Sequence, residues 1–188
     1  MSFVDFLDRD STTAARLLLG CNLIRQIDGE QVVVKIVETE SYDQADAASH
    51  SYKGKTPRTE VMFGPSGYLY VYFTYGMHYC CNVVTGQSGE GSAVLIRAVE
   101  PVKGESVLEA RRNKFGVELT NGPAKLCQAL GIDKSMNGHD LRAEPLILES
   151  ADAVPDSMVV AAKRVGISRA VDEMRRFYIK DNPYISTP

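Results

Sequence analysis

The sequence predicts an α+β fold: a single compact mixed domain built on a mostly antiparallel, curved sheet with dispersed helices. Three observations predict it. Strand-like segments dominate the middle of the chain, and hairpin signals such as Asp28-Gly29 join them in place of regular strand–helix alternation. The 188 residues, 44% of them hydrophobic, suffice for one sizeable core. No linker rich in Gly, Ser or Pro divides the chain, so residues 1–188 are expected to form one domain.

The individual elements follow from local patterns along the chain. Asp10 or Ser11 is a typical N-cap, and the helix that follows is expected to end at Gly20. Pro123 and Gly131 mark the start and the end of another short helix, the usual asymmetry of helix termini. Strands are expected at 21–27, 31–40, 68–73, 78–84, 92–99, 145–149 and 176–180, and a further helix at 104–114.

Charge and hydropathy exclude several classes of protein. The N-terminal stretch MSFVDFLDRD carries acids where a signal peptide carries bases, and no apolar run is long enough to cross a membrane. We therefore expect a cytoplasmic protein. The net charge of −3 gives no global attraction to nucleic acid. Basic residues do gather in 47–59, 103–114 and 163–180, although most such clusters are solvated surface.

Cysteine and histidine residues do not form a recognisable metal site. The four cysteines include no C-x-x-C pair, and adjacent Cys80 and Cys81 would point to opposite faces of a strand. His50, His78 and His139 are scattered. We expect reduced cysteines in the core, no metal and no cofactor. The H-x-E…P-C-x-x-C signature of zinc nucleobase deaminases is also missing.

Tyrosines gather in one uncharged part of the chain. Five of the nine lie in YLYVYFTYGMHYCC, residues 68–81, inside a run from 61 to 89 that has no charged residue. On a strand, the tyrosines at 68, 70 and 72 share one face, while Leu, Val and Phe at 69, 71 and 73 share the other. The apolar face is expected in the core. The tyrosine face suits a wall that meets both water and a flat aromatic ligand, although tyrosine is also a good strand former.

Two carboxylates end the strand expected at 31–40. They belong to VETESY, residues 37–42, and in a regular strand Glu38 and Glu40 share the face of the apolar residues at 32, 34 and 36. The strand is then either leaving the core for solvent or delivering an acid to a pocket. Tyr42 and His50 follow closely, and a carboxylate beside aromatic walls is partly desolvated, which favours a base.

Five long segments of the chain match one known family in sequence and in order. They are VETESYDQADAASHS, KTPRTEVMFGPSGYLYVYFTYGMHYCCNVV, AVLIRAVEP, LTNGPAKLCQALGI and RFYIKDNPYIS. With them the chain resembles the alkyladenine (3-methyladenine) DNA glycosylase family, from about residue 16 to the C-terminus. The resemblance implies a monofunctional base-excision enzyme with a compact mixed domain. It would remove 3-methyladenine, 7-methylguanine, hypoxanthine or ethenoadenine and leave an abasic site.

Two catalytic residues are implied by this resemblance. Glu40 matches the general base, which activates a water molecule for attack on the sugar. Arg97, in VLIRA, would lie beside that water and Glu40. Glu38 matches no role as the base. No lysine nucleophile is needed, because water attacks.

Four substrate-binding residues are implied in the same way. Tyr42 and Tyr72 would form opposite aromatic walls of a pocket for the flipped base. His50 would contact that base and stack near Tyr42. Asn82 would reject the exocyclic amino group of normal guanine.

Further residues are expected to bind DNA outside the pocket. The resemblance places Tyr75 at the tip of a DNA-inserting β-hairpin, where it would enter the minor groove. Met77 and His78 follow it in the tip, and an apolar turn of this kind is often a contact point. Lys125, in LTNGPAKLCQALGI, is the fourth expected DNA contact.

The expected partner is double-stranded DNA that contains a damaged purine, and the chain is expected to act as a monomer. One alternative is a non-catalytic nucleic-acid module that uses the tyrosines as a stacking platform. That alternative explains the aromatic residues but leaves Glu40 without a task. Formation of product separates the two.

Overall fold

The computed structural model describes residues 6–74 and 76–187 of the chain. Its helices and strands are α2 (Ser11–Leu18), β1 (Asn22–Ile27), β2 (Glu30–Tyr42), β3 (Leu69–Phe73), β4 (Tyr79–Val84), β5 (Ala93–Lys103), α3 (Glu105–Arg112), α4 (Pro123–Leu130), β6 (Leu146–Glu149), β7 (Val159–Ala162) and β8 (Arg176–Ile179). Short 3₁₀ helices lie at Glu60–Phe63, Gly116–Leu119, Lys134–Met136 and Asp156–Met158.

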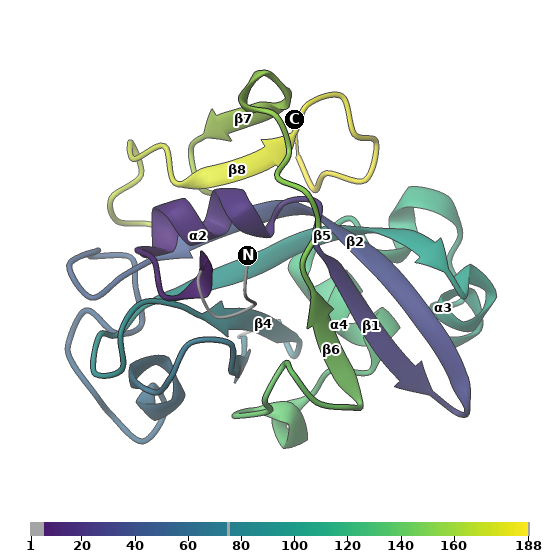
Figure 1. Cartoon of the computed structure of the whole chain (residues 1–188), viewed down its shortest axis with the longest axis horizontal. Coiled ribbons are helices and arrows are strands. Elements are labelled where there is room, and N and C mark those ends of the chain that lie inside the picture. The colour runs from purple at the N-terminus through teal and green to yellow at the C-terminus, as the bar shows by residue number, and fades with distance from the viewer. Residues whose placement is uncertain (1–5, 75, 188) are drawn as a thin grey trace.

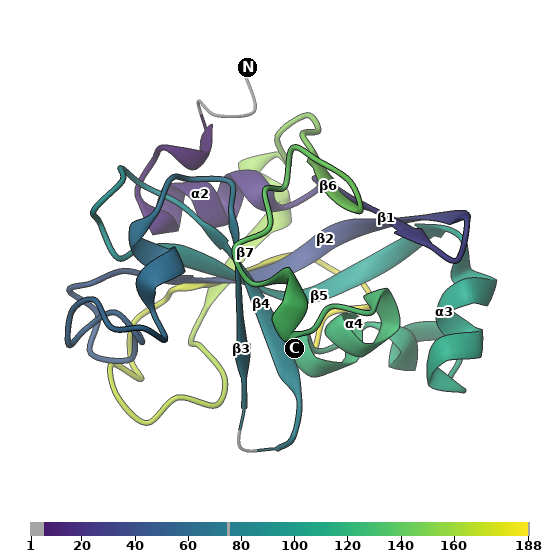
Figure 2. The ribbon, with the colours of Figure 1, turned by 90° about the horizontal axis from the view of Figure 1, so that it is seen from below.

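One sheet of eight strands organises the described residues (Figure 1). Its main path runs β3-β4-β5-β2-β1-β6, while β8 pairs with both β2 and β7. Every pair of strands is antiparallel. The sheet curls, so that β3 and β4 stand across the direction of β1 and β2 (Figure 2). These features confirm the predicted α+β fold with its mostly antiparallel, curved sheet.

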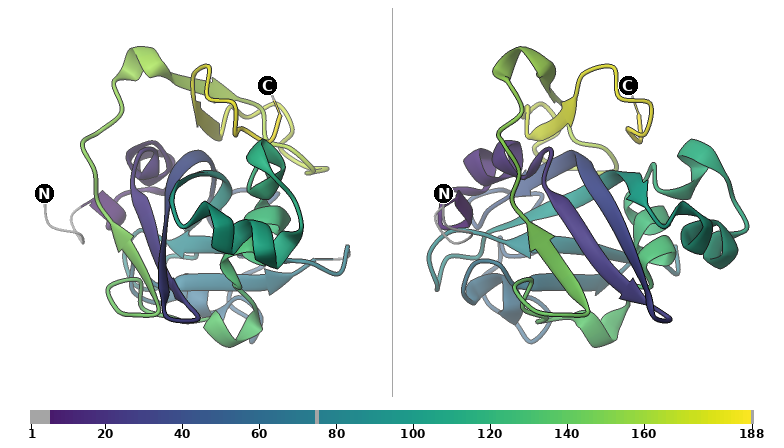
Figure 3. Two further views of the ribbon diagram at one scale, coloured as in Figure 1. Left: turned by 90° about the vertical axis from the view of Figure 1, so that its right-hand side faces the viewer. Right: turned by 45° about the vertical axis from the view of Figure 1, so that its right-hand side comes forward.

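The β1–β2 hairpin turns at the two residues that predicted it. Asp28 has φ 50° and Gly29 has φ 84°, the left-handed conformation that a tight hairpin turn requires at both central positions. All seven predicted strands are present, and β5 extends four residues beyond its expected end, to Lys103. The short strand β7 was not predicted. It has only four residues and pairs with β8, which lies beside it (Figure 3).

Helix α2 begins at one of its two candidate caps. The Asp10 carboxylate accepts hydrogen bonds from the main-chain N–H groups of Thr12 at 3.0 Å and Thr13 at 2.9 Å, so Asp10 is the N-cap. Ala14 and Leu18 are fully buried against the sheet. Because α2 packs on β2, it helps to fix the strand that carries the two glutamates.

The two neighbouring cysteines of β4 point to opposite sides, as expected. Cys81 belongs to the main apolar core, which also contains residues of α2, β5 and α4. Cys80 faces the pocket described below. All four cysteines are free and buried, in agreement with the expected reduced core residues.

An irregularity in β2 decides where the two glutamates point. Ile36 pairs with residue 99 of β5, and Glu38 with the adjacent residue 98, so these two side chains point to opposite faces. Thr39 then hydrogen-bonds to α2 through Ala15, which leaves Glu38 and Glu40 on the face away from α2. The expectation that the glutamates share the face of the apolar residues at 32, 34 and 36 is therefore wrong. The bulge adds one residue and reverses the alternation.

The expectations about membrane spans and metal sites can be compared with the described residues. No helix in 6–74 or 76–187 is long and apolar enough to cross a bilayer. In the same residues, no group of three or more His, Cys, Asp or Glu side chains is placed to hold a metal ion. Independence from metal remains a prediction about the reaction.

Candidate active site

A pocket of about 650 Å³ lies on the face of the sheet that carries Glu40. Its walls come from β2, β3, β4 and β5, from the loop after β2, from the start of α4 and from residues 165–169. Six residues singled out from the sequence line it together: Glu40, Tyr42, His50, Tyr72, Asn82 and Arg97. Side chains up to 57 positions apart in sequence thus meet at one site.

Glu40 is fully buried and is held by three donors. The Tyr42 hydroxyl donates to Oε2 at 2.7 Å. The main-chain N–H of Val165 donates to Oε1 at 2.8 Å, and Arg97 Nη1 lies 3.2 Å from the same oxygen. A carboxylate has about four acceptor positions. Among the described residues three are occupied, two on Oε1 and one on Oε2, so Oε2 keeps one unoccupied acceptor position.

Glu38 is buried as completely as Glu40. It forms ion pairs with Arg176 at 2.8 Å and with Arg97 at 3.5 Å. Neither glutamate is therefore a solvated strand end, which was one of the two expectations for this strand. Two carboxylates and two guanidinium groups balance their charge here, as buried ions require.

Aromatic rings cover one side of the pocket. Tyr70 and Tyr72 are stacked, with centroids 5.7 Å apart, and His50 meets the Tyr72 ring edge-on at 4.5 Å. The His50 ring nitrogen Nδ1 shares a hydrogen bond with the Tyr70 hydroxyl at 3.1 Å. Tyr70 therefore has a role in the site beyond favouring a strand. Its hydroxyl holds the ring of His50, the residue expected to contact the base.

His50 lines the pocket and is partly exposed to solvent. Desolvation of its ring, and secondly the nearby Arg58 cation, lower the pKa of His50 to about 4. The imidazole is therefore neutral at physiological pH. A neutral ring can donate from one nitrogen and accept at the other, which suits recognition of a base edge.

Tyr42 forms a second aromatic surface beside Glu40. Burial, and then the Glu40 charge, raise the pKa of its hydroxyl far above the ordinary range. The hydroxyl therefore stays protonated and donates to Glu40. On the Tyr42 ring lies the guanidinium of Arg164, 4.7 Å from the centroid. The ring is thus fixed both at its hydroxyl and by a cation.

Arg164 is a site residue that the sequence did not reveal. It forms a fully buried ion pair with Asp46 and donates to the main-chain carbonyl of Ser41 at 3.1 Å. The residue after it, Val165, donates to Glu40. Arg164 belongs to the basic stretch at 163–180, which the sequence treats as surface. No local pattern distinguishes a buried arginine from its solvated neighbours.

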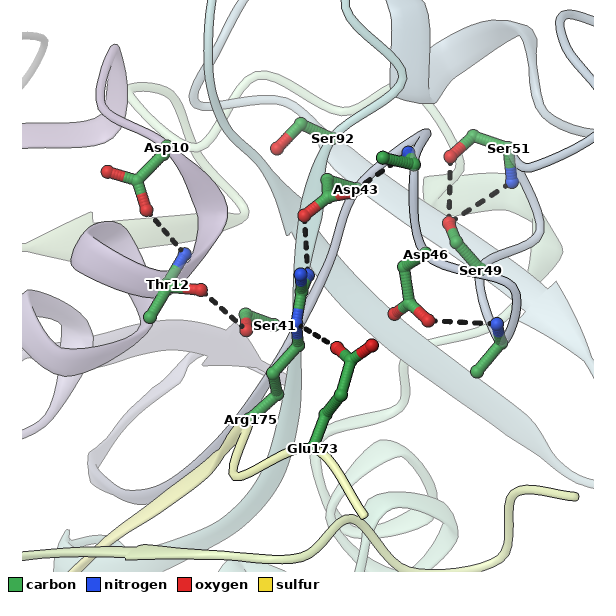
Figure 4. Close-up of polar contacts among 12 residues, drawn as sticks. Asp10, Thr12, Ser41, Asp43, Asp46, Ser49, Ser51, Ser92, Glu173 and Arg175 are labelled. Carbon is green, nitrogen blue, oxygen red and sulfur yellow. Dashed lines mark hydrogen bonds and ion pairs between the residues drawn. The ribbon is translucent and has the colours of Figure 1, made fainter. Parts of the chain in front are cut away.

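Polar contacts hold the loop after β2 both before His50 and directly around it. Arg175, just before β8, forms an ion pair with Asp43 (Figure 4). Ser49 and Ser51, the residues that flank His50, share a hydrogen bond of 2.7 Å (Figure 4). Both serines are buried, so this loop presents His50 from a fixed backbone.

Asn82 lies deep in the pocket wall on β4. Its side-chain amide donates to the carbonyl oxygen of Tyr70, its partner across the β3–β4 ladder, at 3.1 Å. Next to it, Cys80 contacts the Tyr72 hydroxyl. Burial, and secondly Cys81, raise the pKa of Cys80 to about 11, so the thiol is neutral.

Three of the predicted DNA-binding residues, Met77, His78 and Lys125, lie outside the pocket wall. Tyr75 falls outside the described residues. Met77 has φ 62° and is 77% exposed, and His78 beside it is exposed too, at the projecting end of the β3–β4 hairpin (Figure 2). Lys125 is engaged on the surface, where it bonds to Glu118 at 2.8 Å and to the side chain at position 121 at 2.7 Å.

Comparison with known proteins places this chain in a family. The profile of the family described as "Methylpurine-DNA glycosylase (MPG)" matches residues 5–183. Proteins of Carboxydothermus hydrogenoformans and Methanoculleus marisnigri are 50% and 47% identical to this chain, and each alignment covers 96% of both chains. A protein of Desulfitobacterium hafniense is 48% identical over 97% of this chain and 96% of its own. All three carry the name "Putative 3-methyladenine DNA glycosylase". These matches cover nearly the whole chain, and the chain therefore belongs to the methylpurine-DNA glycosylase family.

Proposed function

We propose that this chain turns a damaged purine out of duplex DNA and hydrolyses the bond between that base and its sugar. Its substrates are 3-methyladenine, 7-methylguanine, hypoxanthine and ethenoadenine, and its product is an abasic site. One observation carries the proposal. A fully buried carboxylate with one open acceptor position lies at a pocket that three tyrosines line.

Base flipping explains why the pocket is aromatic. A base inside the duplex is out of reach, and its extrusion costs a few kcal/mol in lost stacking and pairing. Stacking on aromatic side chains returns about 1–3 kcal/mol per base. Tyr42 and Tyr72 supply these surfaces, and any purine offers a face to them. We assign to Asn82 the rejection of normal guanine. Its amide is held by the bond to the Tyr70 carbonyl and would collide with the exocyclic amino group.

Hydrolysis needs a base for water at the sugar carbon C1′. The open position on Glu40 Oε2 accepts a proton from that water, whose oxygen bonds to C1′ as the glycosidic bond breaks. The base leaves with the bonding electron pair, through a transition state of oxocarbenium character. A cationic alkylated purine leaves as a neutral molecule, whereas a neutral base such as hypoxanthine must also gain a proton, which solvent water supplies. Arg97 holds Glu40 in place.

The hairpin end supports insertion into DNA. Met77 is a large exposed apolar side chain at a projecting tip, and apolar wedges fill the gap that an extruded base leaves. We assign Tyr75 the same role, with His78 and Lys125 as further DNA contacts. The whole chain acts as one domain, as a monomer and in the cytoplasm. The chemistry needs no metal, so we expect full excision in EDTA.

The decisive experiment is single-turnover excision from duplexes that each carry one lesion, read as strand cleavage at the abasic site after alkali. Glu40→Gln keeps the shape of the side chain but cannot take the proton. We expect its rate to fall by about 10²-fold or more while DNA binding survives. The matched control is Glu100→Gln, because Glu100 pairs with Lys35 outside the pocket.

Two outcomes contradict the proposal. If the wild-type protein binds lesion duplexes but forms no abasic site, the chain is a binding module. If Glu40→Gln excises at the wild-type rate, another group is the base.

A further inference from the structure

Glu38 takes no part in the chemistry proposed above, yet its carboxylate makes four polar contacts, one more than that of Glu40. It accepts from Arg176 Nη1 at 2.8 Å, from the main-chain N–H of Ser186 at 2.6 Å and from the Ser186 hydroxyl at 3.0 Å. Arg97 Nε lies 3.5 Å from it. Hydrogen bonds to a charged group are the strong ones, so the position of this carboxylate is well defined.

Ser186 connects Glu38 to Arg97. Its hydroxyl donates to Glu38 and accepts from two nitrogens of Arg97, Nη2 at 3.3 Å and Nε at 3.4 Å. Arg97 is itself almost fully buried. Two of its three guanidinium nitrogens are therefore engaged on the side of Glu38 and Ser186. Only Nη1 reaches Glu40, at 3.2 Å.

This division matters because of how a guanidinium binds a carboxylate. Left alone with one carboxylate, it forms two parallel hydrogen bonds, one to each oxygen. Such a pairing would occupy both oxygens of Glu40, including Oε2, which otherwise has one open position. Here Glu38 and Ser186 bind the Nε and Nη2 atoms of Arg97. Arg97 therefore contacts Glu40 through Nη1 alone.

We propose that Glu38 and Ser186 are positioning residues that turn Arg97 so that the second oxygen of Glu40 stays available to water. The inference rests on the proposed function, in which Glu40 is the base. It adds that the segment after β8 is part of the active site. Glu38 acts through Arg97 and does not touch the substrate.

The test measures single-turnover excision and duplex Kd for Glu38→Gln and Ser186→Ala. Ser186 is only half-buried, so its alanine variant is expected to fold even if Glu38→Gln does not. We expect each to lower the rate by at least about 10-fold, the effect of losing a hydrogen bond to a charged group. Kd for the lesion duplex should stay unchanged, because neither side chain lines the pocket. Glu149→Gln is the matched control here, because Glu149 lies on β6 and does not line the pocket.

A double-mutant cycle separates positioning from a merely structural role. If Glu38 acts through Arg97, Glu38→Gln should cost almost nothing further in an Arg97→Ala background. Equal costs in both backgrounds, or wild-type rates for folded Glu38→Gln and Ser186→Ala, would overturn the inference. These results differ from failure of the proposed function, in which the wild-type protein is inactive or Glu40→Gln is active.

Discussion

Glu40 accepts hydrogen bonds from three different parts of the chain. One donor is a side chain two residues away on the same strand, one is a side chain of β5, and one is a main-chain N–H beyond β7. The resemblance to known glycosylases named the two side chains. The main-chain donor has no signature in a sequence, because every residue except proline has the same N–H group.

The Tyr42 hydroxyl should matter for the chemical step more than for binding. Tyr42→Phe keeps the ring that stacks on a base and loses the 2.7 Å hydrogen bond to Glu40. We expect the single-turnover rate to fall by about 10-fold, because a bond to a charged acceptor is lost. Tyr72→Phe is the control, since its hydroxyl is hydrogen-bonded to the Cys80 thiol and not to Glu40. An equal loss in both variants would contradict the assignment.

His50 should titrate well below an ordinary histidine. Its pKa of about 4 in the folded protein lies below the unfolded value of 6.5. Between these values the unfolded chain binds more protons, so the contribution of neutral His50 to stability is full above pH 6.5 and is lost as the pH falls towards 4. NMR titration of the His50 ring measures the midpoint. Arg58→Ala should raise it, and an unchanged midpoint would remove the Arg58 cation as a cause.

At the scale of elements, the sequence predicted the strands and the helices better than their faces. Alternation identified β2 correctly, and Asp28-Gly29 fixed its first turn. The bulge after Ile36 was not predictable from β2 alone, because it arises where β2 and β5 pair out of step. A single extra residue reversed the expected face of Glu38 and Glu40 and put both on the pocket side.

The buried Arg164–Asp46 pair should anchor the segment that reaches Glu40. Asp46→Asn removes the closest counter-charge of a buried guanidinium, whose other acidic partner, Glu173, is 4.0 Å away. We expect a loss of about 3–5 kcal/mol in the free energy of unfolding. Asp43→Asn breaks the partly exposed pair with Arg175 and should cost about 1 kcal/mol or less. Urea unfolding of both variants measures the difference. Similar values for the two would show that burial does not set the strength of the Asp46 pair.

For the whole molecule, the matched motifs identified the family and the pocket residues but not what holds them. Arg164 and Ser186 lie 123 and 148 residues from their main-chain and carboxylate partners on β2. Periodicity and turn chemistry describe neighbours in sequence, so they carry no information on such contacts. The pocket wall on β3 and β4, by contrast, is local, and the run of tyrosines revealed it.

These long separations have a consequence for the order in which the protein acquires its function. The tyrosine wall forms from one hairpin, whereas Glu40 meets Val165 only when a loop of more than a hundred residues closes. Contacts between distant parts of a chain carry a larger entropic cost and form more slowly. The chain has no tryptophan, so intrinsic fluorescence reports on its tyrosines. On dilution from urea we expect tyrosine fluorescence to recover first and excision to lag behind. We therefore expect the refolding chain to form the part of the aromatic wall on β3 before it can cut the bond.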